Sequence, residues 1–269
     1  MAPVPGDLNG DGKPDLIWQN EATRQVGVWY MSGPNTIQAF AWIAPFSVPG
    51  WTVRGSTDLD GDGHPDVILQ NDSTGQVTVW YMGGPQGNTI LSFVWIAPFN
   101  VPGWTVRGLA DLDGDGHPDV ILQHDSTGQV AVWYMGGPQG STILSFAWIA
   151  SFNVPGWTVR AAADLNGDGK PDIVLEYDTT RQVAVWYMGG PQGSTIQSFA
   201  WIDPVGLSGW HVAGLTDLDG NGKPDVIREN DLTRQVSVLY MGGPQGNVVQ
   251  STGWISQTDV SGWQLIVPH

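Results

Sequence analysis

Four short apolar segments, each bounded by turn-forming residues, follow one another along about 50 residues of the chain. They occupy residues 51–59, 66–71, 76–82 and 90–99, and they are rich in β-branched and aromatic side chains. The sequences between them (DGDG, NDSTG and GGPQG) are typical of turns. No segment keeps a 3.6-residue hydrophobic period, and Pro and Gly recur too often for a helix longer than one turn. The pattern predicts four β-strands and an all-β fold.

This pattern belongs to an internal repeat. A nine-residue string, DLDGDGHPD or a close variant of it, begins at Asp7, Asp58, Asp111, Asp164 and Asp217. Residues 58–110 and 111–163 are identical at 46 of 53 positions. No linker separates the copies, so we expect a single domain that spans residues 1–269. Its five repeat units are approximately 7–57, 58–110, 111–163, 164–216 and 217–269.

Five units of four strands predict a five-bladed β-propeller with four antiparallel strands in each blade. A β-solenoid has shorter coils without tight hairpins, and a β-sandwich would not need five near-identical units. The first unit lacks the strand that WTVRG forms in later units, whereas an additional segment, GWQLIV at Gly262–Val267, follows the last unit. We expect this C-terminal strand to join the N-terminal blade and close the ring, which leaves no long open sheet edge.

The nine-residue string is also the most acidic part of each unit. In the second unit, carboxylates stand at positions 1, 3, 5 and 9 (Asp58, Asp60, Asp62 and Asp66), and Gly63 at position 6 permits a sharp turn. Four neighbouring carboxylates repel one another unless a cation is bound. A set of oxygen ligands alone favours calcium over zinc or copper. The string is not an EF-hand, because a strand residue replaces the bidentate Glu at position 12. It therefore predicts one calcium site per unit, about five in all.

An acidic loop of this kind, joining two strands of a repeat of about 50 residues, resembles the FG-GAP/VCBS repeats of the integrin alpha-subunit propeller and of many bacterial secreted proteins. The resemblance covers essentially the whole chain and implies a calcium-binding β-propeller. Integrin propellers have seven blades whereas this chain encodes five, so integrin partner binding does not carry over. Transferred by position, the implied metal ligands are Asp7, Asn9, Asp11, Asp15, Asp58, Asp60, Asp62, Asp66, Asp111, Asp113, Asp115, Asp119, Asp164, Asn166, Asp168, Asp172, Asp217, Asp219, Asn221 and Asp225.

The formal net charge of −16 is concentrated in these loops, which hold 17 of the 26 acidic residues. Five divalent cations would reduce it to −6. A nucleic-acid partner is disfavoured, because phosphate binding needs clustered Lys and Arg. No apolar run approaches the roughly 20 residues that span a bilayer, so we expect no membrane insertion. The N-terminal MAPVPG lacks the features of a signal peptide.

The expected cellular location follows from calcium affinity. Extracellular calcium modules bind at about 10⁻⁴–10⁻³ M, a range in which cytosolic calcium would leave them empty. We therefore expect an extracellular or cell-surface protein, as the family resemblance also implies. We also expect the protein to be a monomer.

No catalytic residues are predicted. The five His residues do not cluster: His64 and His117 lie at a loop position that Lys takes in other units. Paired carboxylates occur inside the metal loops, whereas a glycosidase needs two free carboxylates that face each other across a cleft. We therefore expect that the chain is not an enzyme.

Tryptophan is the other distinctive feature, with three copies in a typical unit. These side chains could pack between blades, or they could line pockets between blades in which sugar rings stack, with the GGPQG loops supplying amides nearby. The main hypothesis is a multivalent, lectin-like carbohydrate-binding module. The alternatives are an adhesion module for an extracellular protein, or a structural repeat scaffold, natural or engineered, with no ligand beyond calcium. The candidate ligand-binding residues are Trp42, Trp51, Trp95, Trp104, Trp148, Trp157, Trp201 and Trp210.

Overall fold

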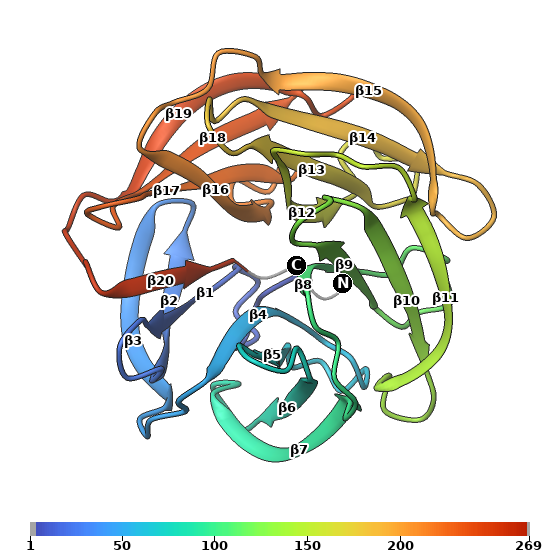
Figure 1. Cartoon of the computed structure of the whole chain (residues 1–269). Coiled ribbons are helices and arrows are strands. Elements are labelled where there is room, and N and C mark those ends of the chain that lie inside the picture. Colours follow the sequence, from blue (N-terminus) through green and yellow to red (C-terminus); the bar gives the residue numbers. More distant parts are fainter. Residues whose placement is uncertain (1–3, 268–269) are drawn as a thin grey trace.

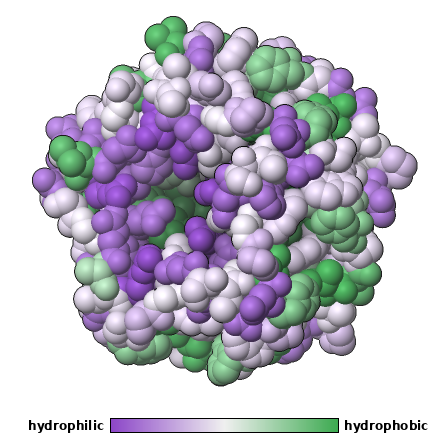
Figure 2. Space-filling model, viewed as in Figure 1, coloured by the Kyte–Doolittle hydropathy of each residue, from purple (hydrophilic) through white to green (hydrophobic). Residues whose placement is uncertain are grey.

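Five antiparallel β-sheets are arranged as a ring around a common centre in the computed structural model, which describes residues 4–267 (Figure 1). Each sheet has four strands, so the predicted all-β, five-bladed propeller is confirmed. The described residues form strands and turns without a helix, and none of them forms a helix able to cross a bilayer. Figure 2 shows that the centre of the ring is hollowed on the face viewed, with hydrophilic side chains around the hollow.

Each blade is one sheet, written here from its innermost to its outermost strand. Blade 1 is β20-β1-β2-β3, and blades 2 to 5 are β4 to β7, β8 to β11, β12 to β15 and β16 to β19. The strand bounds are β1 Leu16–Asn20, β2 Val26–Gly33, β3 Thr36–Ala44, β4 Trp51–Thr57, β5 Asp66–Asn71, β6 Val77–Gly83, β7 Thr89–Ala97, β8 Trp104–Ala110, β9 Asp119–His124, β10 Val130–Gly136, β11 Thr142–Ala150, β12 Trp157–Ala163, β13 Asp172–Tyr177, β14 Val183–Gly189, β15 Thr195–Asp203, β16 Trp210–Thr216, β17 Asp225–Asn230, β18 Val236–Gly242, β19 Val248–Ser256 and β20 Trp263–Ile266.

The ring is closed by the C-terminal strand, as the sequence predicts. Strand β20 pairs antiparallel with β1, with Ile266 opposite Ile17 and Trp263 opposite Asn20. Around the centre of the ring, β20 lies between β16 and β4, the innermost strands of blades 5 and 2. Each sequence unit is therefore offset from the blades: unit 58–110 supplies three strands to blade 2 and the innermost strand, β8, to blade 3. This offset ties every blade covalently and by hydrogen bonds to its neighbour.

The hydrophobic core lies between adjacent blades. The third strand, such as β6, is buried on both faces, whereas most of the outermost strand β7 is exposed. One cluster, for example, joins Val79 and Tyr81 of blade 2 to Val106 and Leu122 of blade 3. Apolar runs without strict alternation are expected of strands that are covered on both faces. This explains why the third strand of each blade has a continuous apolar sequence.

A buried amide also connects neighbouring blades. The Nε2 of Gln123 in β9 donates to the Trp157 carbonyl at 2.7 Å, and its Oε1 accepts from Val159 N at 2.9 Å, both in blade 4. Its Nε2 also donates to the Gly128 carbonyl at 3.2 Å. Glu176 takes the equivalent position in blade 4, where its Oε2 accepts from Val212 N at 2.6 Å.

Replacing this amide should destabilise the ring. We expect Gln123→Leu to lower the free energy of unfolding by ~2–4 kcal/mol, because each buried polar group left without a partner costs about 1–3 kcal/mol. Urea denaturation followed by Trp fluorescence measures the loss. The matched control is Gln129→Leu, since the Gln129 side chain is only partly buried and donates to the Ser151 carbonyl near the surface. An equal effect of the two substitutions would contradict the structural role of Gln123.

Candidate functional site

The acidic loops share one conformation. In blades 2 to 5 each loop connects the first and second strands, and in blade 1 the loop leads into β1. In blade 2, Asp58 accepts backbone N–H groups with both carboxylate oxygens, from Gly61 at 2.8 Å and from Gly63 at 2.9 Å. Both glycines have positive φ angles, 77° and 93°, a conformation that favours glycine. The same bonds recur in the other four loops, including those with Asn at position 3 or 5. The first Asp of the string therefore folds the loop around itself.

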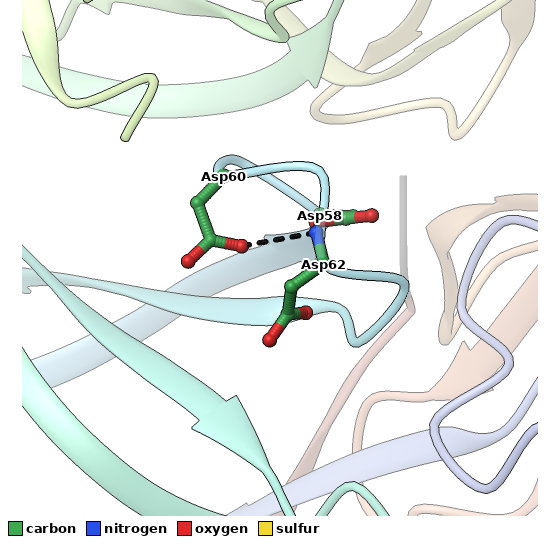
Figure 3. A group of neighbouring side chains, drawn as sticks. All are labelled: Asp58, Asp60 and Asp62. Carbon is green, nitrogen blue, oxygen red and sulfur yellow. Dashed lines mark hydrogen bonds between the residues drawn. The ribbon is translucent and has the colours of Figure 1, made fainter. Parts of the chain in front are cut away.

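This fold brings carboxylates together. In Figure 3, Asp60 and Asp62 point away from the ribbon beside Asp58, and the Asp60 carboxylate accepts the Asp62 N–H at 3.2 Å. Groups of three acidic residues whose ligand oxygens lie within 4.8 Å of one another are Asp58, Asp60 and Asp62; Asp111, Asp113 and Asp115; and Asp217, Asp219 and Asp225. Closely spaced carboxylate oxygens are the ligands that calcium prefers, so the donor set of these loops fits the ion.

The carboxylate at position 9 is fully buried and has a structural role that the sequence pattern did not indicate. The Oδ2 of Asp66 accepts from Leu59 N at 3.0 Å and its Oδ1 from Met82 N at 2.9 Å. Burial, together with the nearby Asp60 and Asp58 carboxylates, raises the pKa of Asp66 to about 7, although the two hydrogen bonds lower it. The group thus fastens the loop to the third strand, and a bound cation would favour its charged form.

The equivalent position 9 carboxylates behave in the same way in the other blades. Burial raises the pKa of Asp15 and Asp119 to about 7, and the pKa of Asp172 and Asp225 to about 6. Each accepts the two corresponding backbone N–H groups. The five loops are therefore anchored alike.

In blades 2 to 5 the GGPQG turn packs against the acidic loop of the preceding blade. A Cβ at Gly140 would lie 2.1 Å from the Leu59 carbonyl oxygen, so only glycine fits there. The Tyr81 hydroxyl donates to the Gln139 carbonyl of the same turn at 2.7 Å. These contacts explain the repetition of WYMGGPQG along the chain as a requirement of blade packing.

The tryptophans singled out from the sequence form surface pairs. In each pair a Trp at the start of the innermost strand contacts a Trp near the end of the outermost strand of the same blade, and the outer member is 40–45% exposed. The ring centroids are 5.6–5.8 Å apart in the pairs Trp263–Trp42, Trp51–Trp95, Trp104–Trp148, Trp157–Trp201 and Trp210–Trp254. The sequence reasoning omitted Trp254 and Trp263, which the repeat period alone could have identified.

Two of these pairs line pockets. The pocket in blade 3 has a volume of about 270 Å³ and includes Trp104, Trp148 and Trp133, together with Phe99 from the connection between β7 and β8. The pocket in blade 5 measures about 610 Å³ and includes Trp210 and Trp254. It also contains an ion pair, Arg228 with Asp203 at 3.0 Å, so it is more polar than the pocket in blade 3. Tryptophan positions that are equivalent in sequence therefore lie in unlike surroundings.

Carboxylates outside the acidic loops take part in ion pairs. Asp72 pairs with Arg24 of the preceding blade at 3.0 Å, and Glu176 pairs with Arg160 at 3.0 Å and with Arg181 at 2.8 Å. His211 lies between two carboxylates, Glu229 and Asp231. The Asp72–Arg24 pair joins blades 1 and 2, whereas the other pairs lie within blade 4 or blade 5.

Comparison with known proteins finds relatives among the integrin alpha subunits. The chain is 29% identical to human (Homo sapiens) integrin alpha-IIb over 153 residues, which covers 47% of this chain and 15% of the integrin. It is 26% identical to chicken (Gallus gallus) integrin alpha-V over 198 residues, which covers 63% of this chain and 19% of the integrin. The chain thus matches less than one fifth of the length of either relative.

Two solved structures show a distant likeness. One is TcdB2-TccC3 without its hypervariable C-terminal region, with a TM-score of 0.37 and 13% identity over 91% of this chain and 13% of that one. The other is Raptor from Chaetomium thermophilum, with a TM-score of 0.42 and 10% identity over 96% of this chain and 21% of that one. Neither likeness carries an argument about function.

The sequence also matches the family described as FG-GAP-like repeat three times in succession, over residues 58–122, 111–175 and 164–228. These matches together cover well over half of the chain and overlap in the way that successive repeats do. The repeated acidic loop, the blade of four strands and these matches agree, and the chain belongs to the FG-GAP-like repeat family.

Proposed function

We propose that this chain is a calcium-binding propeller that acts as a multivalent carbohydrate-binding module. The observation that supports the proposal most is the pair of surface tryptophans that recurs once in every blade. Large aromatic side chains that stay 40–45% exposed at five equivalent positions present flat apolar faces to the solvent. Sugar rings present C–H groups on one face, and these stack on such aromatic surfaces.

Polar groups lie close to the stacking surfaces. The Asn88 amide, directly after a GGPQG turn, donates to the Trp42 carbonyl at 3.0 Å, and Asn247 donates to the Trp201 carbonyl at 3.2 Å. Binding sites for small ligands commonly combine apolar walls with a few placed polar groups. One stacking site alone would be weak, and repetition around a rigid ring would raise the overall affinity for a branched or surface-bound glycan.

In this proposal calcium supports the ring without touching the sugar. Trp51 begins β4 and the acidic loop follows the end of β4, so the stacking surface and the metal loop lie at opposite ends of the strand. Asp58, Asp60 and Asp62 would hold the ion in this blade, which would neutralise their mutual repulsion. The proposed site count is five, one per acidic loop.

Removing the exposed tryptophans should abolish sugar binding. We expect the variant with Ala at Trp42, Trp95, Trp148, Trp201 and Trp254 to lose its glycan-array signals and to bind at least 100-fold more weakly by calorimetry. The matched control carries Leu91→Ala and Leu144→Ala, which remove exposed side chains of the outer strands and keep every Trp. Absence of any glycan signal from the unaltered protein, or equal loss in both variants, would refute the proposal.

A second candidate is adhesion to an extracellular protein, and two observations favour it. The relatives found by comparison are integrin alpha subunits. The outermost strands also expose apolar side chains, with Leu91, Phe93 and Leu144 each at least 60% exposed. A protein ligand should bind after enzymatic removal of its glycans and should be lost in the Leu91→Ala/Leu144→Ala variant. Retention of binding by that variant would count against protein adhesion.

The extracellular or cell-surface location and the monomeric state belong to the same proposal. A millimolar calcium supply outside the cell suits sites of the expected affinity. Light scattering during gel filtration in calcium should give the mass of one chain, about 28.9 kDa. If neither glycan nor protein binds under these conditions, the third hypothesis applies. In it, the protein is a repeat scaffold with calcium as its only ligand.

A further inference from the structure

Three arginines converge at the centre of the ring. Arg54, Arg107 and Arg160 take the same position in the innermost strands of blades 2, 3 and 4, whereas Ala213 and Ile266 take it in blades 5 and 1. All three arginines line one cavity, whose remaining walls come from the inner strands of the other two blades. The positive charges of the three arginines therefore lie on the side of blades 2 to 4, whereas blades 5 and 1 line the cavity with apolar residues and with His211 and Gln264.

A backbone irregularity accompanies each arginine. In β4 the pairing with β5 passes from Val53 opposite Leu69 to Gly55 opposite Ile68 and skips Arg54. Arg107 and Arg160 are skipped in the same way. A β-bulge of this kind re-aims the side chain of the extra residue. The bulge thus accounts for three long cationic side chains that line the centre of the ring.

The arginines have donors without partners. Their Nε–H groups are buried and donate no hydrogen bond within residues 4–267. Arg160 pairs with Glu176 at 3.0 Å and Arg107 lies 3.8 Å from Asp125, whereas Arg54 has no ion pair in the described part of the chain. Burial, together with the positive charges of Arg54 and Arg160, lowers the pKa of Arg107 to about 10. The three guanidinium groups repel one another, and each keeps a buried Nε–H without an acceptor.

We propose that this cavity binds a small tetrahedral oxyanion of the sulfate or phosphate class, held by Arg54, Arg107 and Arg160. The planar guanidinium presents paired N–H donors that match such oxygens. The cavity volume of about 90 Å³ exceeds the ~10–15 Å³ that one water molecule requires, so the cavity has room for a small ion. The site is separate from the acidic loops and from the tryptophan pairs, so it is independent of the proposed sugar binding.

Calorimetry of the full, calcium-loaded chain with sodium sulfate tests the site. Because salt screens charge interactions, sodium chloride is added so that all samples have the same ionic strength. We expect saturable binding of one sulfate per chain, at least tenfold weaker binding by Arg107→Gln, and binding within twofold of the unaltered protein by Arg24→Gln. Arg24 is the matched control because it pairs with Asp72 outside the cavity.

Thermal melts give a second readout. Sulfate raises the stability of many proteins without a site, so the comparison is between variants. We expect sulfate to raise the melting temperature of the unaltered protein by more than it raises that of Arg54→Gln. This second variant also provides a test if Arg107→Gln fails to fold. Equal melting shifts, equal sulfate affinities, or no saturable heat would overturn the proposal. Tighter binding of acetate than of sulfate would overturn the tetrahedral class.

Discussion

Removing calcium with a chelator should lower the melting temperature of this protein by about 12–24 °C relative to a sample in about 10 mM calcium. A site with a dissociation constant of about 10⁻⁴–10⁻³ M, as in extracellular modules, is stabilised at that concentration by ~1.4–2.7 kcal/mol. Five such sites stabilise the fold by ~7–14 kcal/mol. With an unfolding entropy of ~2.1 cal/mol/K per residue over 269 residues, this gives the expected shift.

Differential scanning calorimetry measures the effect, and magnesium at the same concentration is the control. Magnesium requires near-ideal octahedral geometry and releases water reluctantly, so we expect it to restore only a small part of the stability. A melting temperature that is the same in calcium and in chelator would refute the metal assignment. Asp62→Ala, which alters one loop, should remove about one fifth of the shift.

Asp66→Ala should destabilise the protein even without calcium. The substitution leaves the buried N–H groups of Leu59 and Met82 without their acceptor. Each unsatisfied buried group costs about 1–3 kcal/mol, so we expect a loss of ~2–6 kcal/mol. At the unfolding entropy given above, this lowers the melting temperature by ~4–10 °C in chelator, as measured by calorimetry.

The control is Asp62→Ala in the same loop. Asp62 is exposed and accepts one backbone N–H, from His64 at 2.8 Å. In chelator we therefore expect Asp62→Ala to cost at most ~1 kcal/mol, whereas in calcium both variants should lose one site. Equal melting temperatures of the two variants in chelator would show that Asp66 acts as a ligand alone.

Several features of the fold could be predicted from the sequence because they depend on residues that are close in the chain or that recur in each repeat. Turn residues between apolar runs set the strands, and the period of 53 residues sets the number of blades. The additional segment GWQLIV predicts the closure that β20 makes with β1. The spacing of carboxylates within nine residues likewise predicts the clusters of the acidic loops. In each case the interacting residues are close in sequence or related by the repeat.

Other features depend on how blades meet. Nothing near Asp66 in sequence indicates that its carboxylate accepts the N–H of Met82, 16 residues later in the third strand. The pairing of Trp210 with Trp254 likewise follows from bringing the first and fourth strands of a blade together. Pattern reasoning assigned a ligand role to Asp66 and to Trp210, and it could not predict these two contacts.

The sequence by itself determined the repeat, the number of blades, the closing strand and the position of the acidic loops, because each is encoded in consecutive or periodic residues. Only the tertiary structure decided which repeated residues converge. Arg54, Arg107 and Arg160 are 53 residues apart and gather in one cavity because the innermost strands of successive blades surround a common centre and a bulge redirects each side chain. The effect of differences between units likewise depends on neighbouring residues in the ring. Arg228, for example, pairs with Asp203 in the pocket of blade 5.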